Sequence, residues 1–162
     1  MSGIKHTLGG ALATELIMET FRLNGRLLDA GNELVRDAGL TSARWQVLGA
    51  MAASPVPLSV AHIARNMGLT RQAVQRLANE MEEDDLVRFA PNPHHERAKL
   101  VLMTDAGNRA FAKAMARQAP WANALAKGLD RDDLAAAVRG LAALRQRLET
   151  VEKQRHRAQQ GG

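Results

Sequence analysis

The chain has 162 residues, of which 46% are hydrophobic and 24% are charged, a balance typical of a folded protein rather than a disordered one. It contains no cysteine, which excludes disulfides, thiolate zinc sites and a cysteine nucleophile. The formal net charge is +5, but residues 139–162 hold six basic residues and two acidic ones. A solvated basic tail therefore explains the excess charge at least as well as a nucleic-acid surface does.

The apolar runs are far shorter than the roughly 20 residues that a membrane-spanning helix needs. The first residues also lack the pattern of a signal peptide. We therefore expect a cytoplasmic protein that does not enter a membrane.

A long helix is predicted over residues 7–38, where leucines recur at steps of three and four residues or their multiples. Gly25 and Gly31 weaken this helix, so a kink or a break is expected near them. Gly39 is suited to end the helix.

Three shorter helices follow, and a Ser or Thr precedes each one as its expected N-cap: residues 42–53 after Thr41, 60–66 after Ser59, and 71–83 after Thr70. Two prolines within residues 54–57 predict a loop between the first and the second of these helices.

After residue 85, the spacing of the hydrophobic residues changes from the period of a helix to that of a strand. Residues 86–89 and 99–103 predict two strands, and the polar segment 91–96 between them predicts the tip of a β-hairpin.

Two helices are predicted after the hairpin. Thr104 caps the first, which runs to about Met115, and Pro120 is expected to interrupt or kink it. After a break near residues 128–130, the last helix carries an apolar stripe with spacings of 4, 3, 3, 4 and 3: Leu134, Val138, Leu141, Leu144, Leu148 and Val151. Such a stripe is typical of a helix that packs lengthwise on a partner.

The spacing within residues 58–77 fits a helix-turn-helix. Ala64 is small enough for two helices to cross closely, and Gly68, four residues later, allows the tight turn. Val74 and Leu77 would hold the second helix against the first.

The opposite face of that second helix is polar and carries Arg71, Gln72, Gln75, Arg76 and Asn79. Arginine can pair with guanine, and glutamine or asparagine can pair with adenine. The helix start at Thr70 offers free N–H groups to a phosphate, whereas the acidic residues 82–85 would point away from DNA. A plain helical hairpin with a polar face has the same pattern, but the following β-hairpin favours a winged helix.

Residues 70–87 resemble the recognition helix and exit of MarR-type (multiple-antibiotic-resistance) transcription regulators. Residues 92–107 are similar to the wing of that family and its closing Leu/Met-Thr-x-x-Gly segment. Residues 41–51, with Trp45 and Leu48, resemble the helix that leads into the DNA-reading part.

The resemblance covers roughly residues 7–152 and implies a single, mainly α-helical domain with a small β-hairpin. In this interpretation, residues 41–104 form a winged helix-turn-helix. Long dimerisation helices, residues 7–38 and 130–157, flank it.

The wing departs from the family pattern at one point. Family wings usually carry acidic residues before the arginine, in an Asp-x-Arg pattern, whereas in this chain His94 and His95 occupy those places ahead of Glu96 and Arg97. The usual acidic partner two residues before Arg97 is therefore replaced by His95. The resemblance implies that Arg97 either braces the wing or enters the minor groove. The expected wing and backbone contacts to DNA come from Ser59, His94, His95, Arg97 and Lys99.

A single winged helix reads only a few base pairs, so we expect a homodimer on a pseudo-palindromic site. Its two recognition helices would lie about one DNA turn apart, roughly 34 Å. The expected dimer interface contains Leu8, Leu12, Leu16, Leu141, Leu144 and Leu148. The alternative is that both apolar stripes pack within one monomer.

The resemblance also implies a cleft for a small aromatic or phenolic effector between the dimer helices and the DNA-reading part. Phe21, Arg22, Arg44 and Trp45 are the candidates to flank it. In the alternative interpretation, the two aromatic residues are ordinary core and the two arginines are solvated.

The sequence carries no Ser-His-Asp order in a catalytic motif, no glycine-rich phosphate loop and no spacing that converges histidines on a metal. We therefore expect no catalysis, no cofactor and no metal site. The sequence predicts a sequence-specific regulator that binds double-stranded DNA, more readily a repressor than an activator. The alternative is a helical dimeric interaction protein or ligand-binding module whose helix-turn-helix no longer reads DNA.

Overall fold

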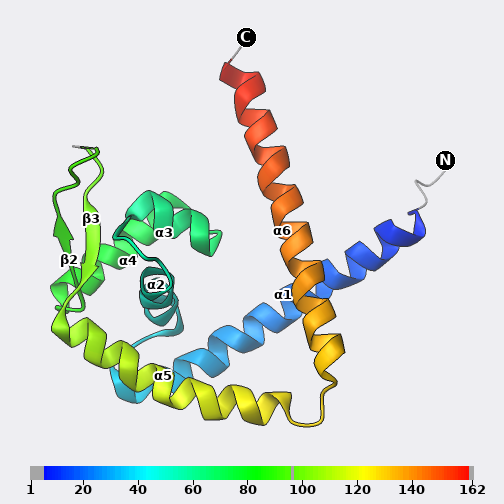
Figure 1. Ribbon diagram of the computed structural model, residues 1–162, viewed down its shortest axis with the longest axis horizontal. Helices are drawn as coiled ribbons and strands as arrows, with labels where there is room; N and C mark the ends of the chain where they lie inside the picture. The colour runs from blue at the N-terminus through cyan, green and yellow to red at the C-terminus, as the bar shows by residue number, and fades with distance from the viewer. Residues whose placement is uncertain (1–5, 96, 161–162) are drawn as a thin grey trace. The chain divides into compact units, whose positions relative to one another are not determined.

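The computed structural model describes residues 6–95 and 97–160, which fall into two compact units. The head unit comprises residues 21–122, and the arm unit comprises the residues up to Thr20 together with those from Asn123 onward. The boundaries fall within two long helices, α1 (Leu8–Val35) and α5 (Asp105–Ala126) (Figure 1).

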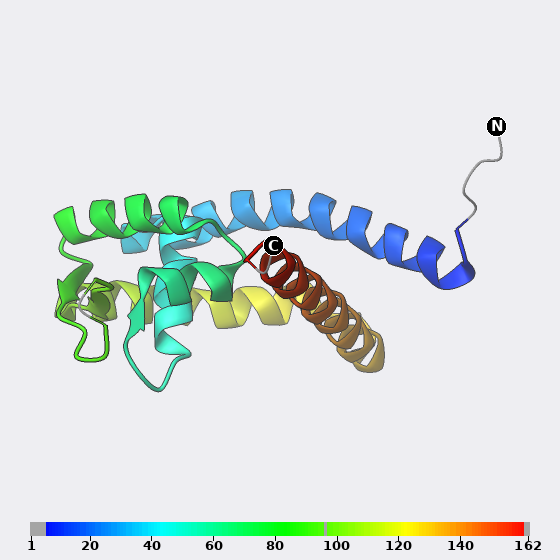
Figure 2. The same ribbon diagram turned by 90° about the horizontal axis from the view of Figure 1, so that it is seen from above.

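Helix α1 is continuous through Gly25 and Gly31, so the break expected there is absent (Figure 2). Gly31 is buried, and a Cβ at this position would lie 2.7 Å from the hydroxyl oxygen of Ser42. The glycine therefore permits close packing of α1 on the start of the next helix rather than a change of direction. A short 3₁₀ turn, η1 (Arg36–Ala38), follows α1.

Three helices build the centre of the head unit: α2 (Ser42–Ala52), α3 (Val60–Met67) and α4 (Arg71–Glu83). Two of the predicted N-caps are confirmed, because the Thr41 hydroxyl accepts from the Arg44 amide at 3.3 Å and the Thr70 hydroxyl from the Ala73 amide at 3.2 Å.

The helix-turn-helix is confirmed in its packing. Ala64 is 3% exposed in the core, and its carbonyl accepts from the Leu69 amide at 2.9 Å. Gly68 has φ of 65°, the left-handed conformation that ends α3 and that glycine adopts at low cost.

The predicted hairpin forms from β2 (Val87–Ala90) and β3 (Leu100–Met103), which lie beside α4 in Figure 1. The structure adds an antiparallel strand, β1 (Leu58–Ser59), on the other edge of β3, so that the order is β1-β3-β2. The sequence prediction missed β1 because two residues are too few to show alternation. We call β2, β3 and the loop between them the wing.

One apolar core joins the sheet to the helices of the head unit. Its fully buried members come from each of these elements: Val35, Val47, Leu48, Ile63, Val74, Ala78, Met81, Val87, Val101 and Ala114. The core therefore fixes the wing and α4 on one scaffold.

A tight junction connects the end of α4, the wing and the start of α5. The Thr104 hydroxyl donates to the carbonyl of Asp85 and accepts from the Gly107 amide, as expected for the residue that caps α5. A Cβ at Gly107 would lie 1.9 Å from the carbonyl oxygen of Leu86. Only glycine allows the first turn of α5 to approach the backbone of Leu86 this closely.

Of the two effects expected from Pro120, the interruption is wrong, since α5 continues to Ala126 rather than ending near Met115. A proline leaves the carbonyl four residues earlier, here that of Ala116, without its helical N–H. Both residues are exposed, so water can satisfy that carbonyl and the helix is able to continue.

In the arm unit, α6 (Arg131–Gln160) is preceded by Asp130, whose side chain accepts from the amides of Asp132 and Asp133 at 2.7 and 3.1 Å. The start of α1 meets α6 where Leu16 lies 3.5 Å from the Cβ position of Gly140.

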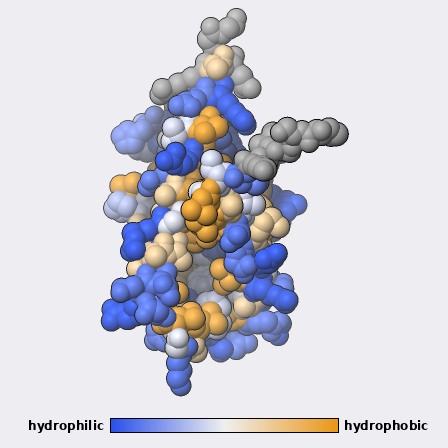
Figure 3. All heavy atoms as spheres, turned by 90° about the vertical axis from the view of Figure 1, so that its right-hand side faces the viewer, coloured by the Kyte–Doolittle hydropathy of each residue, from blue (hydrophilic) through white to orange (hydrophobic). Residues whose placement is uncertain are grey.

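Many apolar side chains of the arm unit stay exposed. They include Leu8, Leu12, Ile17, Met18, Leu134, Val138, Leu141, Leu148 and Val151. Figure 3 shows hydrophobic patches between hydrophilic residues on one face of the molecule. None of the described helices is long and apolar enough to cross a membrane.

We predict that Gly107→Ala destabilises the head unit by at least about 2 kcal/mol, because its methyl group would collide with the backbone of Leu86. Urea unfolding followed by circular dichroism measures the effect. Gly25→Ala is the matched control, because nothing lies within 4 Å of its Cβ position and alanine favours a helix by roughly 0.5–1 kcal/mol. Equal midpoints for Gly107→Ala and the wild type would contradict the close approach.

Candidate nucleic-acid interface

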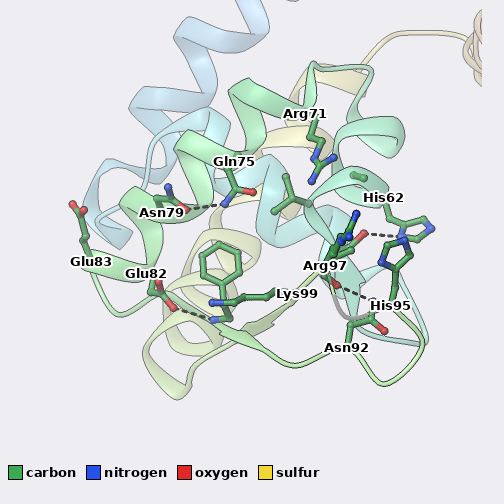
Figure 4. Close-up of a pocket in the computed structure, with 15 residues that line it drawn as sticks. His62, Arg71, Gln75, Asn79, Glu82, Glu83, Asn92, His95, Arg97 and Lys99 are labelled. Atoms are coloured by element: carbon green, nitrogen blue, oxygen red, sulfur yellow. Dashed lines mark hydrogen bonds between the residues drawn. The ribbon is translucent and has the colours of Figure 1, made fainter.

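A hollow of about 940 Å³ lies in the head unit between α4, the start of α3 and the wing (Figure 4). The following residues line it: Ser59, Val60, Ala61, His62, Arg71, Gln75, Asn79, Glu82, Glu83, Phe89, Asn92, His95, Arg97, Ala98 and Lys99.

Helix α4 forms one wall of the hollow with its polar face, because its apolar face packs on the core. Val74 and Ala78 are buried on the core side, whereas Arg71, Gln75 and Asn79, spaced four residues apart, face the hollow. The predicted recognition residues therefore form two sets. Gln72 and Arg76 are exposed on α4 but do not line the hollow, and Thr70 caps the helix.

Two of these wall residues contact each other directly. The Gln75 side-chain amide donates to the side-chain oxygen of Asn79 at 2.9 Å (Figure 4). Arg76, whose side chain is 82% exposed, has its Nε 3.8 Å from a carboxylate oxygen of Glu80, a weak surface pair.

The wing forms the opposite wall, and Asn92 makes two hydrogen bonds within its loop. The Asn92 side-chain amide donates to the Ala98 carbonyl at 2.9 Å, and its side-chain oxygen accepts from the His94 amide at 3.0 Å. Sequence reasoning did not single out Asn92, although an Asn-Pro pair is a recognised turn signal.

The expected wing contacts are distributed unevenly. His95, Arg97 and Lys99 line the hollow, whereas His94 is exposed outside it. Glu96, between His95 and Arg97, lies outside the described residues.

Ser59 occupies the N-cap position of α3, but its side chain does not cap the helix. Its hydroxyl lies 2.9 Å from Nδ1 of His62, and the residue is 4% exposed. This burial argues against the predicted contact from Ser59 to a DNA backbone. His62, which the sequence analysis left aside, is the exposed member of the pair and lines the hollow.

The hollow carries charges of both signs. Arg71, Arg97 and Lys99 are cationic, whereas Glu82 and Glu83 are acidic residues of the last turn of α4, and Figure 4 shows Lys99 reaching toward Glu82. The expectation that the acidic residues 82–85 all point away from this surface is therefore wrong for Glu82 and Glu83. The Glu82 carboxylate accepts from the backbone amide of Phe89 in β2 at 3.0 Å, so it also ties the wing to α4.

Two of the candidates for an effector cleft, Arg44 and Trp45, make contacts that stabilise the fold of the head unit. The Arg44 guanidinium pairs with the Asp84 carboxylate at 2.7 Å and joins α2 to the end of α4, with its side chain 19% exposed. Trp45 packs against the core beside Gly31. Phe21 and Arg22 are exposed on α1, with Phe21 68% exposed.

Among the described residues, no three histidine or acidic side chains are grouped so that they could hold a metal ion.

Residues 38–98 match the sequence model described as the MarR family. The Mycobacterium tuberculosis protein Rv2011c, described as uncharacterized, is 35% identical over 115 residues, which make up 71% of this chain and 79% of that protein. The transcriptional activatory protein BadR of Rhodopseudomonas palustris is 32% identical over 102 residues, 62% of this chain and 58% of BadR.

The fold is similar to that of the Mycobacterium tuberculosis transcriptional regulator MosR, whose crystal structure contains DNA. The TM-score is 0.68 and the sequence identity 25%, and the similarity covers 83% of this chain and 96% of MosR.

We predict that Glu82→Ala speeds hydrogen exchange of the Phe89 amide by about 5- to 10-fold, because that amide loses its acceptor. Nuclear magnetic resonance measures the rate. Glu82→Gln is the matched control, since it keeps a side-chain oxygen to accept the bond, and its exchange rate is expected to stay near that of the wild type. Equal exchange in the alanine variant would mean that Glu82 does not hold the wing.

Proposed function

The chain belongs to the MarR family of transcription regulators, and from this membership we propose that it binds double-stranded DNA as a homodimeric repressor. Each head unit would read one half of a pseudo-palindromic operator. Occupation of a promoter would then block transcription.

The observation that carries this proposal is the composition of the two walls of the hollow. Arg71, Gln75 and Asn79 on α4 offer donors and acceptors suited to base edges in the major groove. Arg97 and Lys99 on the wing offer cations suited to phosphates or to the minor groove. A rigid core holds both walls, so a DNA duplex can meet them at the same time.

The acidic end of the hollow favours one orientation of the DNA. Glu82 and Glu83 repel phosphates, so the DNA backbone would pass near Arg71 and the start of α3 rather than along the end of α4. His62 stands at that cationic side and takes the place of Ser59 as the proposed backbone contact.

The dimer is proposed from the apolar surface of the arm unit. Leu8, Leu12 and Leu148 are 80%, 58% and 65% exposed in the single chain. Apolar surface of this extent is more stable when a second copy covers it. Together with Leu16, Leu141 and Leu144, these residues form the proposed interface.

A small aromatic or phenolic effector would release the repressor by changing the separation of the two recognition helices. The family resemblance supports this part of the proposal. Phe21, which stays exposed on α1, is the aromatic candidate to contact such a ligand.

We predict that the purified protein selects a palindrome with half-sites about one helical turn apart from a pool of random DNA duplexes. Sequencing of the retained duplexes gives the result. Retention of arbitrary sequences, lost steeply as salt rises, would indicate a polyelectrolyte and overturn the proposal.

The matched variant for this experiment carries Arg71→Glu and Arg76→Glu. If α4 reads DNA, reversing these two charges abolishes selection while the fold persists, because both side chains are exposed on α4. Undiminished selection would show that α4 is not the reading element.

We predict that the wild-type chain elutes as a dimer in size-exclusion chromatography with light scattering, and that Leu148→Lys shifts it toward the monomer. A lysine within the apolar stripe would place an unpaired charge in the interface. Gln146→Lys on the same helix is the control expected to stay dimeric. A wild-type monomer at micromolar concentration would contradict the dimer.

A further inference from the structure

We propose that Gln75 and Asn79 act as one unit that reads an adenine in the operator, with Asn79 fixing the orientation of the Gln75 amide. This inference rests on the proposed function, since it assigns the specificity of a DNA-reading α4. It makes Gln75 the specificity-determining residue and Asn79 its positioning residue.

The contact between the two side chains is the first observation. Gln75 Nε2 donates to Asn79 Oδ1 at 2.9 Å, across one turn of α4. Both residues line the hollow, and Figure 4 shows their side chains pointing toward each other along that wall. Val74 and Ala78, which directly precede Gln75 and Asn79 in the sequence, are fully buried, so the backbone that carries the pair is anchored in the core.

The hydrogen-bond inventory of the pair defines what it offers. A primary amide has one carbonyl oxygen and two N–H groups. With one N–H of Gln75 engaged by Asn79, Gln75 keeps one N–H and its Oε1 for a ligand. One donor beside one acceptor matches the adenine edge in the major groove, where N7 accepts and the N6 amino group donates.

The bond also couples the orientations of the two amides. A flip of the Gln75 amide alone would set Gln75 Oε1 against Asn79 Oδ1, two acceptors that repel each other, so the two amides can reverse only together. In the arrangement of the structure Gln75 is the donor of the pair, which gives the order of donor and acceptor along the hollow. Guanine, which presents two acceptors at O6 and N7, would meet the Gln75 oxygen unfavourably.

Asn79 has a second, weaker consequence for sequence preference. Its oxygen is engaged by Gln75, so its own side-chain N–H groups are what it offers to an adjacent base pair. Those donors suit the O4 of thymine or the O6 and N7 of guanine.

The experiment begins from the palindrome that the wild type selects and measures affinity for operators changed one base pair at a time. We expect one adenine per half-site whose replacement by guanine lowers affinity about 10-fold or more. Replacement by 7-deazaadenine, which lacks the N7 acceptor, should lower it similarly. The Gln75→Leu variant should bind operators with adenine, guanine or 7-deazaadenine at that position with affinities within about 2-fold of one another.

The Asn79 variants separate positioning from contact. Asn79→Leu removes the acceptor at similar volume, so the adenine preference should fall several-fold at the position that Gln75 reads. Asn79→Asp keeps an acceptor for Gln75 and should retain that preference, even though the added charge beside Glu82 and Glu83 weakens binding to every sequence. Asn79 is exposed, and thermal unfolding of each variant confirms its fold.

If Asn79→Leu keeps the adenine preference, the coupling between the two side chains is overturned. If no adenine of the operator depends on Gln75, the whole inference is overturned. Both results differ from a failure of the proposed function, because in that failure the wild type would show no sequence preference at all.

Discussion

The arrangement of the candidate interface depends on one close backbone contact, where Gly107 at the start of α5 lies against Leu86. Leu86 follows α4 and precedes the wing, and Thr104 closes the same junction through its hydroxyl bond to the carbonyl of Asp85. The end of α4, the start of the wing and the start of α5 thus meet at Gly107, where a larger side chain would not fit. This junction holds the end of α4 close to the start of the wing, and so contributes to the spacing between the two walls of the hollow.

The sequence predicted most of the elements because their ends carry local chemical signals. Thr41 and Thr70 bind the amides at the helix starts, and Gly68 adopts the left-handed turn, so these boundaries depend on neighbouring residues alone. The strand β1 and the continuation of α5 past Pro120 depend on distant partners or on solvent, which a local pattern does not record. The same limit explains Gly31, whose role is contact with Ser42 rather than flexibility.

For the candidate interface, periodicity was enough to place Arg71, Gln75 and Asn79 on one polar face. It did not separate them from Gln72 and Arg76, because that division depends on where the wing lies. Periodicity also could not predict contacts between elements, such as the hydrogen bond from the Phe89 amide of β2 to the Glu82 carboxylate of α4. Helical spacing shows which residues share a face, whereas the tertiary fold decides what that face meets.

The bond from Glu82 has a consequence for how copies of the chain associate. Strand β2 is an edge of the sheet, and edges with free N–H groups invite strands from other molecules. The carboxylate occupies the outward amide of Phe89, and Arg88 beside it adds an exposed charge. This edge is therefore partly guarded against strand addition, which disfavours aggregation through the wings.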